Sequence, residues 1–305
     1  MNKKLKEKKS PLLLLAASYL ILSGCANESS STTQSQSVYK SEVKAYAKFV
    51  PKRQDDFAWE NDKVAFRVYG PAAPLKGHAS GVDAWLKKVD YSIIDKWYAE
   101  AFNKTGSYHT DTGEGYDPYH VGISRGVGGS AIWVDGKDYT AHNYKSYKIL
   151  TNGPDKVVFT LEYEFETPLG LVNESKTISL PMGSNLYQVN SEFKLDGKPA
   201  SLPIAIGITT HDEKATVSHN EQTGRISASE TFDSMALWTG IVIEPNKVTD
   251  IKHIAKETKD ESHIWLLTKS EKNGSIEYYA GFAWEAAGEI TTQAQWHSYL
   301  DNFNK

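Results

Sequence analysis

The segment KVVFTLEYEFET, residues 156–167, alternates apolar and polar side chains over its whole length. This period of two is typical of a strand with one buried face. Similar segments recur at short intervals, at 64–70, 129–136, 137–150, 171–180, 185–197, 202–211, 236–245, 263–269 and 276–285. Asp135-Gly136 joins two of them and is a hairpin signal. No regular helix separates the strands, which disfavours a parallel α/β sheet. We predict an all-β domain, an antiparallel sandwich or barrel.

Two short helices are expected beside these strands. The first lies around SIIDKWYAEAF, residues 92–102, and the second near the end of the chain, in TTQAQWHSYLDNF, residues 291–303. Either Thr291 or Thr292 has the side chain of an N-cap for the second helix.

The first 25 residues predict export. A basic leader precedes PLLLLAASYLILSG, an apolar segment at 11–24 that is too short for a typical membrane span. Leu22-Ser23-Gly24-Cys25 then resembles the lipobox of bacterial lipoproteins, which implies lipidation of Cys25. The alternative is an ordinary signal peptide that happens to contain a cysteine. Cys25 is the only cysteine in the chain, so an internal disulfide and a cysteine-ligated metal are excluded.

The predicted organisation is a signal peptide at 1–24, a polar tether at 25–45 and a single β-sandwich catalytic domain at 46–305. Ala26 stands where an aspartate would signal retention at the inner membrane. The lipobox resemblance therefore implies an outer-membrane lipoprotein that faces the periplasm or the cell exterior, held to the membrane through Cys25.

Net charge and aromatic content limit the classes of partner that this chain is expected to bind. The formal net charge of -4 gives no basic surface for nucleic acid. Eight tryptophans and seventeen tyrosines suit either core packing or carbohydrate binding, because flat rings offer apolar faces to sugars. Composition alone does not separate these two interpretations.

Reactive side chains concentrate in YHTDTGEGYDPYHVGISRGVGG, residues 108–129. His109 and His120 are acid/base candidates near neutral pH. Arg125 has the paired donors that bind a carboxylate, and the many glycines allow close approach of a ligand. His109, Asp111 and Glu114 could ligate a metal, but their spacing is not specific, so no metal or other cofactor is predicted.

Three further segments carry candidate residues. RQDDFAWEND, residues 53–62, is interpreted as a solvated edge before the first strand, with Arg53 or Trp59 as alternative cleft residues. TTHDEK, residues 209–214, is either a turn or the source of a site histidine, His211. Asn143 is expected on a hairpin strand, facing away from its two neighbours. No G-x-S-x-G motif occurs, which disfavours a serine hydrolase.

Four segments carry a family resemblance: 53–72, 80–98, 108–137 and 144–154. They resemble exported proteins of long-unassigned function from bacterial polysaccharide-utilisation loci, one branch of which is similar to the oligosaccharide dehydratase of ulvan breakdown. The resemblance covers most of the chain after the tether and is strongest in 51–154. It implies a large antiparallel β-sandwich, similar to mutarotases and to the β-domains of polysaccharide lyases, with a few short helices and sugar bound on a concave sheet face.

The resemblance also implies a reaction, the loss of water from a non-reducing-end uronic acid to leave a 4,5-unsaturated residue. Such a site needs a base for the C5 proton, a positive charge for the carboxylate and an acid for the 4-hydroxyl. Arg125 is expected to neutralise the carboxylate, and His109 or His120 to take the proton. Tyr119, Tyr116 or the other histidine is expected to protonate the leaving hydroxyl.

Supporting roles are assigned on the same basis. Glu114 or Asp117 orients a histidine, and His211 contributes from a neighbouring strand end. Seven residues are expected to bind substrate: Trp59, Glu114, Tyr116, Asp117, Trp133, Asn143 and Trp238. The expected partner is an acidic, ulvan-like oligosaccharide. Two alternatives remain, a polysaccharide lyase that abstracts the same C5 proton and a non-catalytic glycan-binding lipoprotein. The oligomeric state is left open.

Overall fold

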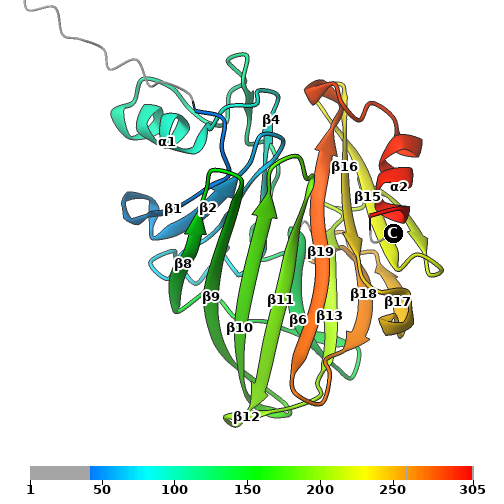
Figure 1. Cartoon of the computed structure of the whole chain (residues 1–305). Coiled ribbons are helices and arrows are strands. Elements are labelled where there is room, and N and C mark those ends of the chain that lie inside the picture. The colour runs from blue at the N-terminus through cyan, green and yellow to red at the C-terminus, as the bar shows by residue number, and fades with distance from the viewer. Residues whose placement is uncertain (1–41, 259, 304–305) are drawn as a thin grey trace, which may run out of the picture. The chain divides into compact units, whose positions relative to one another are not determined.

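The computed structural model describes residues 42–258 and 260–303, which form three antiparallel sheets (Figure 1). The nine-stranded sheet has the order β14-β15-β16-β19-β11-β10-β9-β8, with β12 paired to β11. One five-stranded sheet has the order β1-β2-β3-β4-β5, and the other has the order β17-β18-β13-β6-β7.

The strands of the described residues are β1 (Tyr46–Val50), β2 (Asp56–Glu60), β3 (Ala65–Val68), β4 (Asp83–Lys87), β5 (Gly115–Tyr116), β6 (Val127–Val134), β7 (Lys137–Tyr139), β8 (Ser146–Asn152), β9 (Lys156–Thr167), β10 (Gly170–Pro181), β11 (Leu186–Leu195), β12 (Lys198–Pro199), β13 (Pro203–Thr209), β14 (Thr216–Asn220), β15 (Arg225–Phe232), β16 (Met235–Val242), β17 (Asp250–Ile254), β18 (His263–Lys269) and β19 (Ser275–Trp284). The helices are α1 (Ile94–Asn103) and α2 (Gln293–Asp301), with short 3₁₀ turns at Pro51–Arg53, Pro245–Lys247 and Glu285–Ala287.

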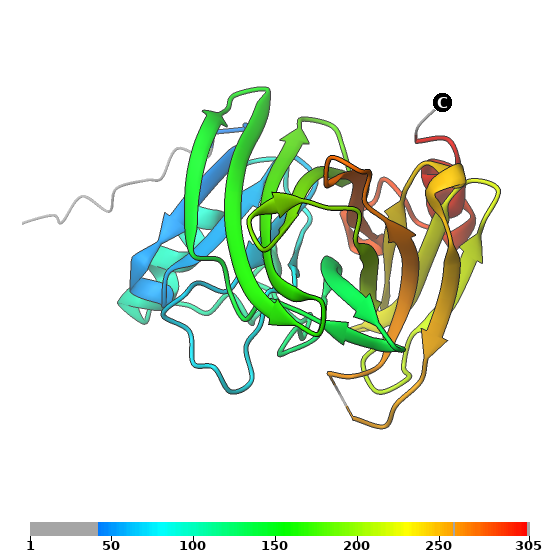
Figure 2. The ribbon, with the colours of Figure 1, turned by 90° about the horizontal axis from the view of Figure 1, so that it is seen from below.

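The alternating segment that predicts a strand at 156–167 is β9, and it pairs with β10 over its whole length. Its inward side chains, Phe159 and Leu161 among them, join one apolar core with Trp59 of β2 and Ile206 of β13. Because side chains from all three sheets meet in this core, the described residues form a β-sandwich, as predicted. Figure 2 shows the same sheets from below.

Both predicted helices are present. Thr292 is the N-cap of α2, and its side chain accepts from the Gln295 backbone N–H in a capping box. Trp296 of α2 packs on Trp238 and Val242 of β16. These two β16 residues alternate with Ile241 of the main core, so α2 covers the opposite face of the nine-stranded sheet.

The hairpin predicted at Asp135-Gly136 is confirmed, since both residues adopt positive φ, 49° and 77°, and join β6 to β7. The strand predicted over 137–150 is wrong in extent. It is interrupted after Tyr139, and β8 begins at Ser146. Asn143 lies in the connection between them, where its side-chain amide donates to the Gly70 carbonyl at 2.8 Å.

The solvated edge predicted at 53–62 is wrong, because β2 is buried along its whole length. Its charged residues have partners inside the protein: the Lys87 ammonium donates to Glu60 at 3.0 Å. Trp59 is fully buried and stacks on Phe66, so it belongs to the core and faces no cleft. The two charged residues of β2, Asp56 and Glu60, are therefore buried groups with internal partners and do not form a solvated surface.

No helix among residues 42–258 and 260–303 is long and apolar enough to cross a membrane. The predicted signal peptide, the lipidated Cys25 and nearly all of the predicted tether lie outside the described residues and stay predictions. The division into domains is likewise a prediction.

Candidate active site

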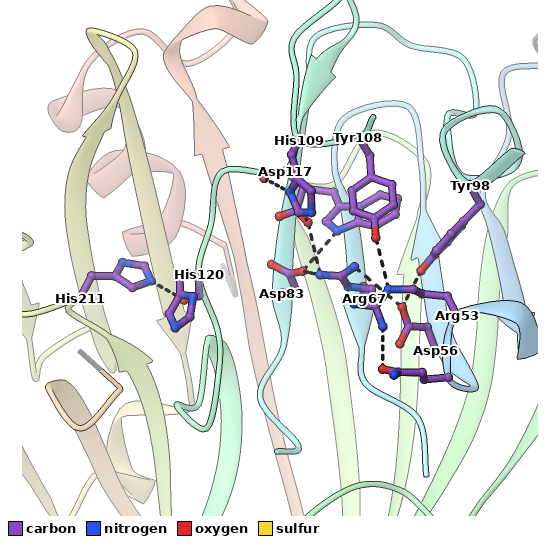
Figure 3. A network of polar contacts seen from close by, with 12 residues as sticks. Arg53, Asp56, Arg67, Asp83, Tyr98, Tyr108, His109, Asp117, His120 and His211 are labelled. Carbon is purple, nitrogen blue, oxygen red and sulfur yellow. Dashed lines mark hydrogen bonds and ion pairs between the residues drawn. The ribbon is translucent and has the colours of Figure 1, made fainter. Parts of the chain in front are cut away.

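The stretch 108–129 is mostly loop, with Gly115–Tyr116 as β5 and the start of β6 at Val127. Its side chains contribute to two separate polar networks, which Figure 3 shows side by side. The first contains His109 and Asp117, and the second contains His120 and His211. We describe each network in turn, and the two histidines of the second line one cleft.

The first network surrounds a buried arginine, Arg67 of β3, and we call it the Arg67 network. Its guanidinium forms ion pairs with Asp83 of β4, with Asp117 at 3.3 Å and with Asp56 of β2 at 3.8 Å. All four side chains are buried. The Tyr98 hydroxyl of α1 donates to Asp56 at 3.1 Å.

Three carboxylates against one guanidinium leave excess negative charge out of water. Burial therefore raises the pKa of Asp117 well above its usual range, with Asp83 adding to the effect. Burial also raises the pKa of Asp56 to about 6, although Arg67 and Arg53 act in the opposite direction. The Arg67 network thus fixes the 108–117 loop to β3 and β4. Within it, Asp117 and Asp56 keep their protons at pH values above the usual aspartate pKa.

His109 lies on the surface of this network. Its Nδ1 is 2.9 Å from the Asp117 carbonyl oxygen and 3.6 Å from Asp117 Oδ2. The His109 side chain is 62% exposed, whereas Asp117 is buried beneath it. His109 therefore covers an internal carboxylate cluster.

The second network lines a cleft of about 510 Å³, which we call the histidine cleft. Two loops and one edge of the nine-stranded sheet form it. Its walls are Pro118, His120, His211, Lys214, Thr216, Ser229, Glu230, Thr231 and Phe232.

His120 is held by a carboxylate from far along the chain. His120 Nε2 is 2.7 Å from Asp260 Oδ1. The His120 side chain is 42% exposed, and its Nδ1 makes no hydrogen bond to any residue that the structure describes. Gly122 permits this approach, since a Cβ there would lie 2.2 Å from Asp260 Oδ2. His120 thus combines an oriented ring with an open nitrogen, as a general base requires.

His211 bridges two parts of the cleft wall. Its Nδ1 is 2.7 Å from both Glu230 oxygens, and its Nε2 is 2.5 Å from the His120 carbonyl oxygen. Carboxylate and carbonyl oxygens only accept, so a ring that donates from both nitrogens satisfies both contacts. Such a ring is a cation, and His211 is therefore suited to supply positive charge rather than to act as a base.

Tyr119 packs against this histidine, with ring centroids 4.6 Å apart in an edge-to-face arrangement. Burial raises the pKa of the Tyr119 hydroxyl well above its usual range, and Glu230 and Asp83 add to the effect. The buried hydroxyl has no hydrogen-bond partner among the described residues.

Arg125, predicted to bind the substrate carboxylate, lies inside the protein and is 1% exposed. Its guanidinium donates to Ser80 Oγ and to the Ile123 carbonyl oxygen, each at 3.0 Å. Burial lowers its pKa to about 10. The guanidinium is buried and does not line the histidine cleft, so it is not presented to a substrate there.

Other predicted residues are spread over the molecule. Glu114 accepts from Lys96 at 2.7 Å and from the Trp97 indole at 3.1 Å, which anchors α1. The Tyr116 hydroxyl donates to Asp233 at 2.6 Å. Neither Glu114 nor Tyr116 lines the histidine cleft.

The two remaining predicted tryptophans are also outside the cleft. Trp238 is buried beneath α2. Trp133 is half-buried beside Trp265, with ring centroids 5.5 Å apart, in a satellite apolar cluster with Ala131 and Ala205. The structure therefore brings Tyr119, His120 and His211 together and separates them from the other candidates.

Two carboxylates of the site were not predicted, Glu230 of β15 and Asp260 in the segment before β18. Neither stands in a motif, and each reaches its histidine across a large sequence separation, 19 residues for Glu230 and 140 for Asp260. Within residues 42–258 and 260–303, no group of three or more His, Cys, Asp or Glu is arranged to hold a metal ion.

Comparisons with known proteins identify relatives of this chain. A family model described as "Domain of unknown function (DUF4861)" matches residues 16–305. "Uncharacterized protein P7" of Formosa agariphila is 41% identical over 276 residues, which cover 87% of this chain and 68% of that protein.

Solved structures give weaker similarities. A 4-α-glucanotransferase from Thermococcus litoralis matches 81% of this chain with 12% identity and a TM-score of 0.34. An α-galactosidase from Geobacillus stearothermophilus in complex with raffinose matches 75% with 10% identity and a TM-score of 0.33. The chain spans 42% and 40% of the length of these two proteins.

Proposed function

We propose that this chain, which belongs to the family described as Domain of unknown function (DUF4861), eliminates water from a uronic acid at the non-reducing end of an acidic, ulvan-like oligosaccharide. The observation that carries the proposal is the grouping of a carboxylate-held histidine and a doubly hydrogen-bonded histidine in the wall of one cleft, with a buried tyrosine packed against the second histidine. The sequence resemblance supplies the substrate class.

His120 is the base in this proposal. The C5 proton of a uronate lies α to a carboxylate and is only weakly acidic, so its removal needs a well-oriented base near neutral pH. Asp260 holds His120 Nε2 and stabilises the imidazolium that forms when Nδ1 takes the proton. His109 is less suited, because its Nδ1 contacts the Asp117 carbonyl and it lies outside the cleft.

Positive charge at the cleft supports recognition of the carboxylate. Lys214 lines the wall and offers its ammonium to the carboxylate. His211 lines the same wall and adds positive charge, while its ring nitrogens stay bonded to Glu230 and the His120 carbonyl. The negative charge that develops on the carboxylate during proton removal is stabilised by fixed cations in a site of this kind. These two residues take over the role that the sequence assigned to Arg125.

Tyr119 is the proton donor. The C5–H bond breaks, its proton passes to His120, and the electron pair is delocalised into the carboxylate. That pair forms the C4–C5 double bond as the C4–O bond breaks, and the departing hydroxyl takes the Tyr119 proton and leaves as water. Proton transfer from His120 through solvent restores Tyr119, so the cycle needs no redox partner.

Product analysis tests this proposal. The protein is incubated with uronate-terminated oligosaccharides, and the ultraviolet band of the unsaturated uronate and the product masses are followed. Loss of one water without chain cleavage is the expected result. Two fragments would instead identify a lyase, and binding without any product would identify a glycan-binding protein.

A histidine pair provides the residue-level control. The His120→Gln variant should lose about 10²- to 10⁴-fold in kcat/KM, the usual contribution of a general base. His109→Gln changes an exposed histidine of the same loop outside the cleft and should keep nearly full activity. Equal losses in both variants would contradict the assignment of His120.

A further inference from the structure

The segment that carries His211 has a backbone conformation that amino acids with side chains rarely adopt. His211, Asp212 and Glu213 have φ values of 41°, 60° and 63°, so three successive residues other than glycine take the left-handed range of φ. No other run of three such residues occurs in the described part of the chain. Each left-handed residue costs about 1–2 kcal/mol, so surrounding contacts must hold the turn.

The Glu213 carboxylate supplies those contacts. Glu213 Oε1 accepts from Thr210 Oγ1 at 3.0 Å and from Ser262 Oγ at 2.5 Å. Its Oε2 is 3.1 Å from His253 Nε2. Burial alone would raise the pKa of Glu213, but these hydrogen bonds outweigh it and lower the pKa below the usual value. One carboxylate thus ties the turn to β17 and to the residue before β18.

The turn sets the direction of the His211 side chain. β13 ends at Thr209, and the chain reverses at once, with the Lys214 N–H donating to the Thr210 carbonyl at 3.1 Å. In this form the His211 ring reaches Glu230 on one side and the His120 carbonyl on the other. Lys214, at the exit of the turn, lines the same cleft.

We propose that Glu213 is a positioning residue that clamps the left-handed turn 211–213 and so keeps His211 and Lys214 directed into the histidine cleft. The proposal rests on the proposed function, in which Lys214 receives the uronate carboxylate and His211 adds positive charge beside it. Glu213 itself does not line the cleft and acts through the turn.

The test uses a readout that does not depend on activity. Nitrogen NMR of the histidine rings in the full chain, with His211 assigned from the His211→Gln variant, should detect N–H protons on both His211 nitrogens. Glu213→Ala should remove or strongly weaken these signals, because the ring leaves its two acceptors. Glu213→Gln keeps an acceptor for Thr210 and Ser262, so it should preserve most of the His211 N–H signal intensity.

Kinetics provides the second readout. Misplacement of a catalytic cation by about 1 Å can cost on the order of 10²-fold, so Glu213→Ala should lower the rate of water elimination by that factor, with partial rescue in Glu213→Gln. Glu221→Ala, at an exposed glutamate in the turn between β14 and β15, is the matched control and should match the parent.

The outcomes separate the two proposals. Unchanged His211 signals in folded Glu213→Ala would overturn the clamp, whatever the activity. If Glu213→Ala does not fold, unaltered His211 signals and rate in Glu213→Asp, whose shorter side chain cannot reach all three partners, would overturn it instead. Absence of water elimination in the parent protein, with the NMR response intact, would reject the proposed function and keep the clamp.

Discussion

His120 and Asp260 are separated by 140 positions in the chain, yet His120 Nε2 lies 2.7 Å from Asp260 Oδ1. This contact orients the imidazole of a residue that lines the histidine cleft. Gly122 makes the contact possible, because Asp260 occupies the space in which a side chain at 122 would begin.

Gly122→Ala should therefore reduce activity more than stability. A Cβ at 122 would lie 2.2 Å from Asp260 Oδ2 and would displace the carboxylate from His120. The backbone, at φ 52°, adds a strain of about 1–2 kcal/mol. Steady-state assays with parallel thermal melts measure both effects.

Gly183→Ala is the matched control for this variant. Gly183 also has a positive φ, 77°, but among the described residues no atom lies within 4 Å of the position that a Cβ would take there. The Gly183→Ala variant should lose a similar amount of stability through backbone strain, and its kcat should be unchanged. Similar kcat values for the two variants would contradict a role for the Asp260 contact.

Tyr119→Phe should abolish most activity without destabilising the fold. The Tyr119 hydroxyl has no partner among the described residues, so its removal breaks no hydrogen bond in the free protein. Tyr278→Phe offers the converse case, since the Tyr278 hydroxyl donates to the Gly128 carbonyl at 2.8 Å. That variant should lose about 1 kcal/mol of stability and keep its kcat. Full activity in Tyr119→Phe would remove Tyr119 from the mechanism.

Arg125→Ala should lower the melting temperature. The substitution deletes a buried guanidinium that donates to Ser80 and Ile123, and it leaves a cavity, at a cost of about 2–4 kcal/mol. The carboxylate-binding role predicted from the sequence requires the opposite, lost turnover with an unchanged thermal transition. Calorimetry and assays on the same preparation distinguish the two.

Asp56→Asn should change how stability depends on pH. Burial raises the folded-state pKa of Asp56 to about 6, above an unfolded value near 3.9. The contribution of protonated Asp56 to the free energy of unfolding is therefore fully present below about pH 4. It is lost as pH rises through about 6, which changes the free energy of unfolding by about 3 kcal/mol. Asparagine does not titrate, so urea unfolding should show a smaller loss of stability over this window. An identical pH profile in both proteins would show that Asp56 does not hold the proton.

Local pattern predicts most of this fold but only part of the site. Strands such as β9 follow from alternation, and the α2 cap follows from Thr292, because both depend on neighbouring residues. β2 was not predicted, since its charges are paired with Arg67 and Lys87 from other strands. The same limit applies to Asp260 and Glu230, whose roles arise from long-range contacts that leave no local signal.

The central claim is that His120 removes the C5 proton in a reaction that releases water. The most direct measurement is the mass of the product formed from a uronate-terminated oligosaccharide by the parent protein, His120→Gln and His109→Gln in parallel. We predict a product lighter by one water with the parent and with His109→Gln, and almost none with His120→Gln. Undiminished product from His120→Gln, or no loss of water with the parent protein, would contradict the claim.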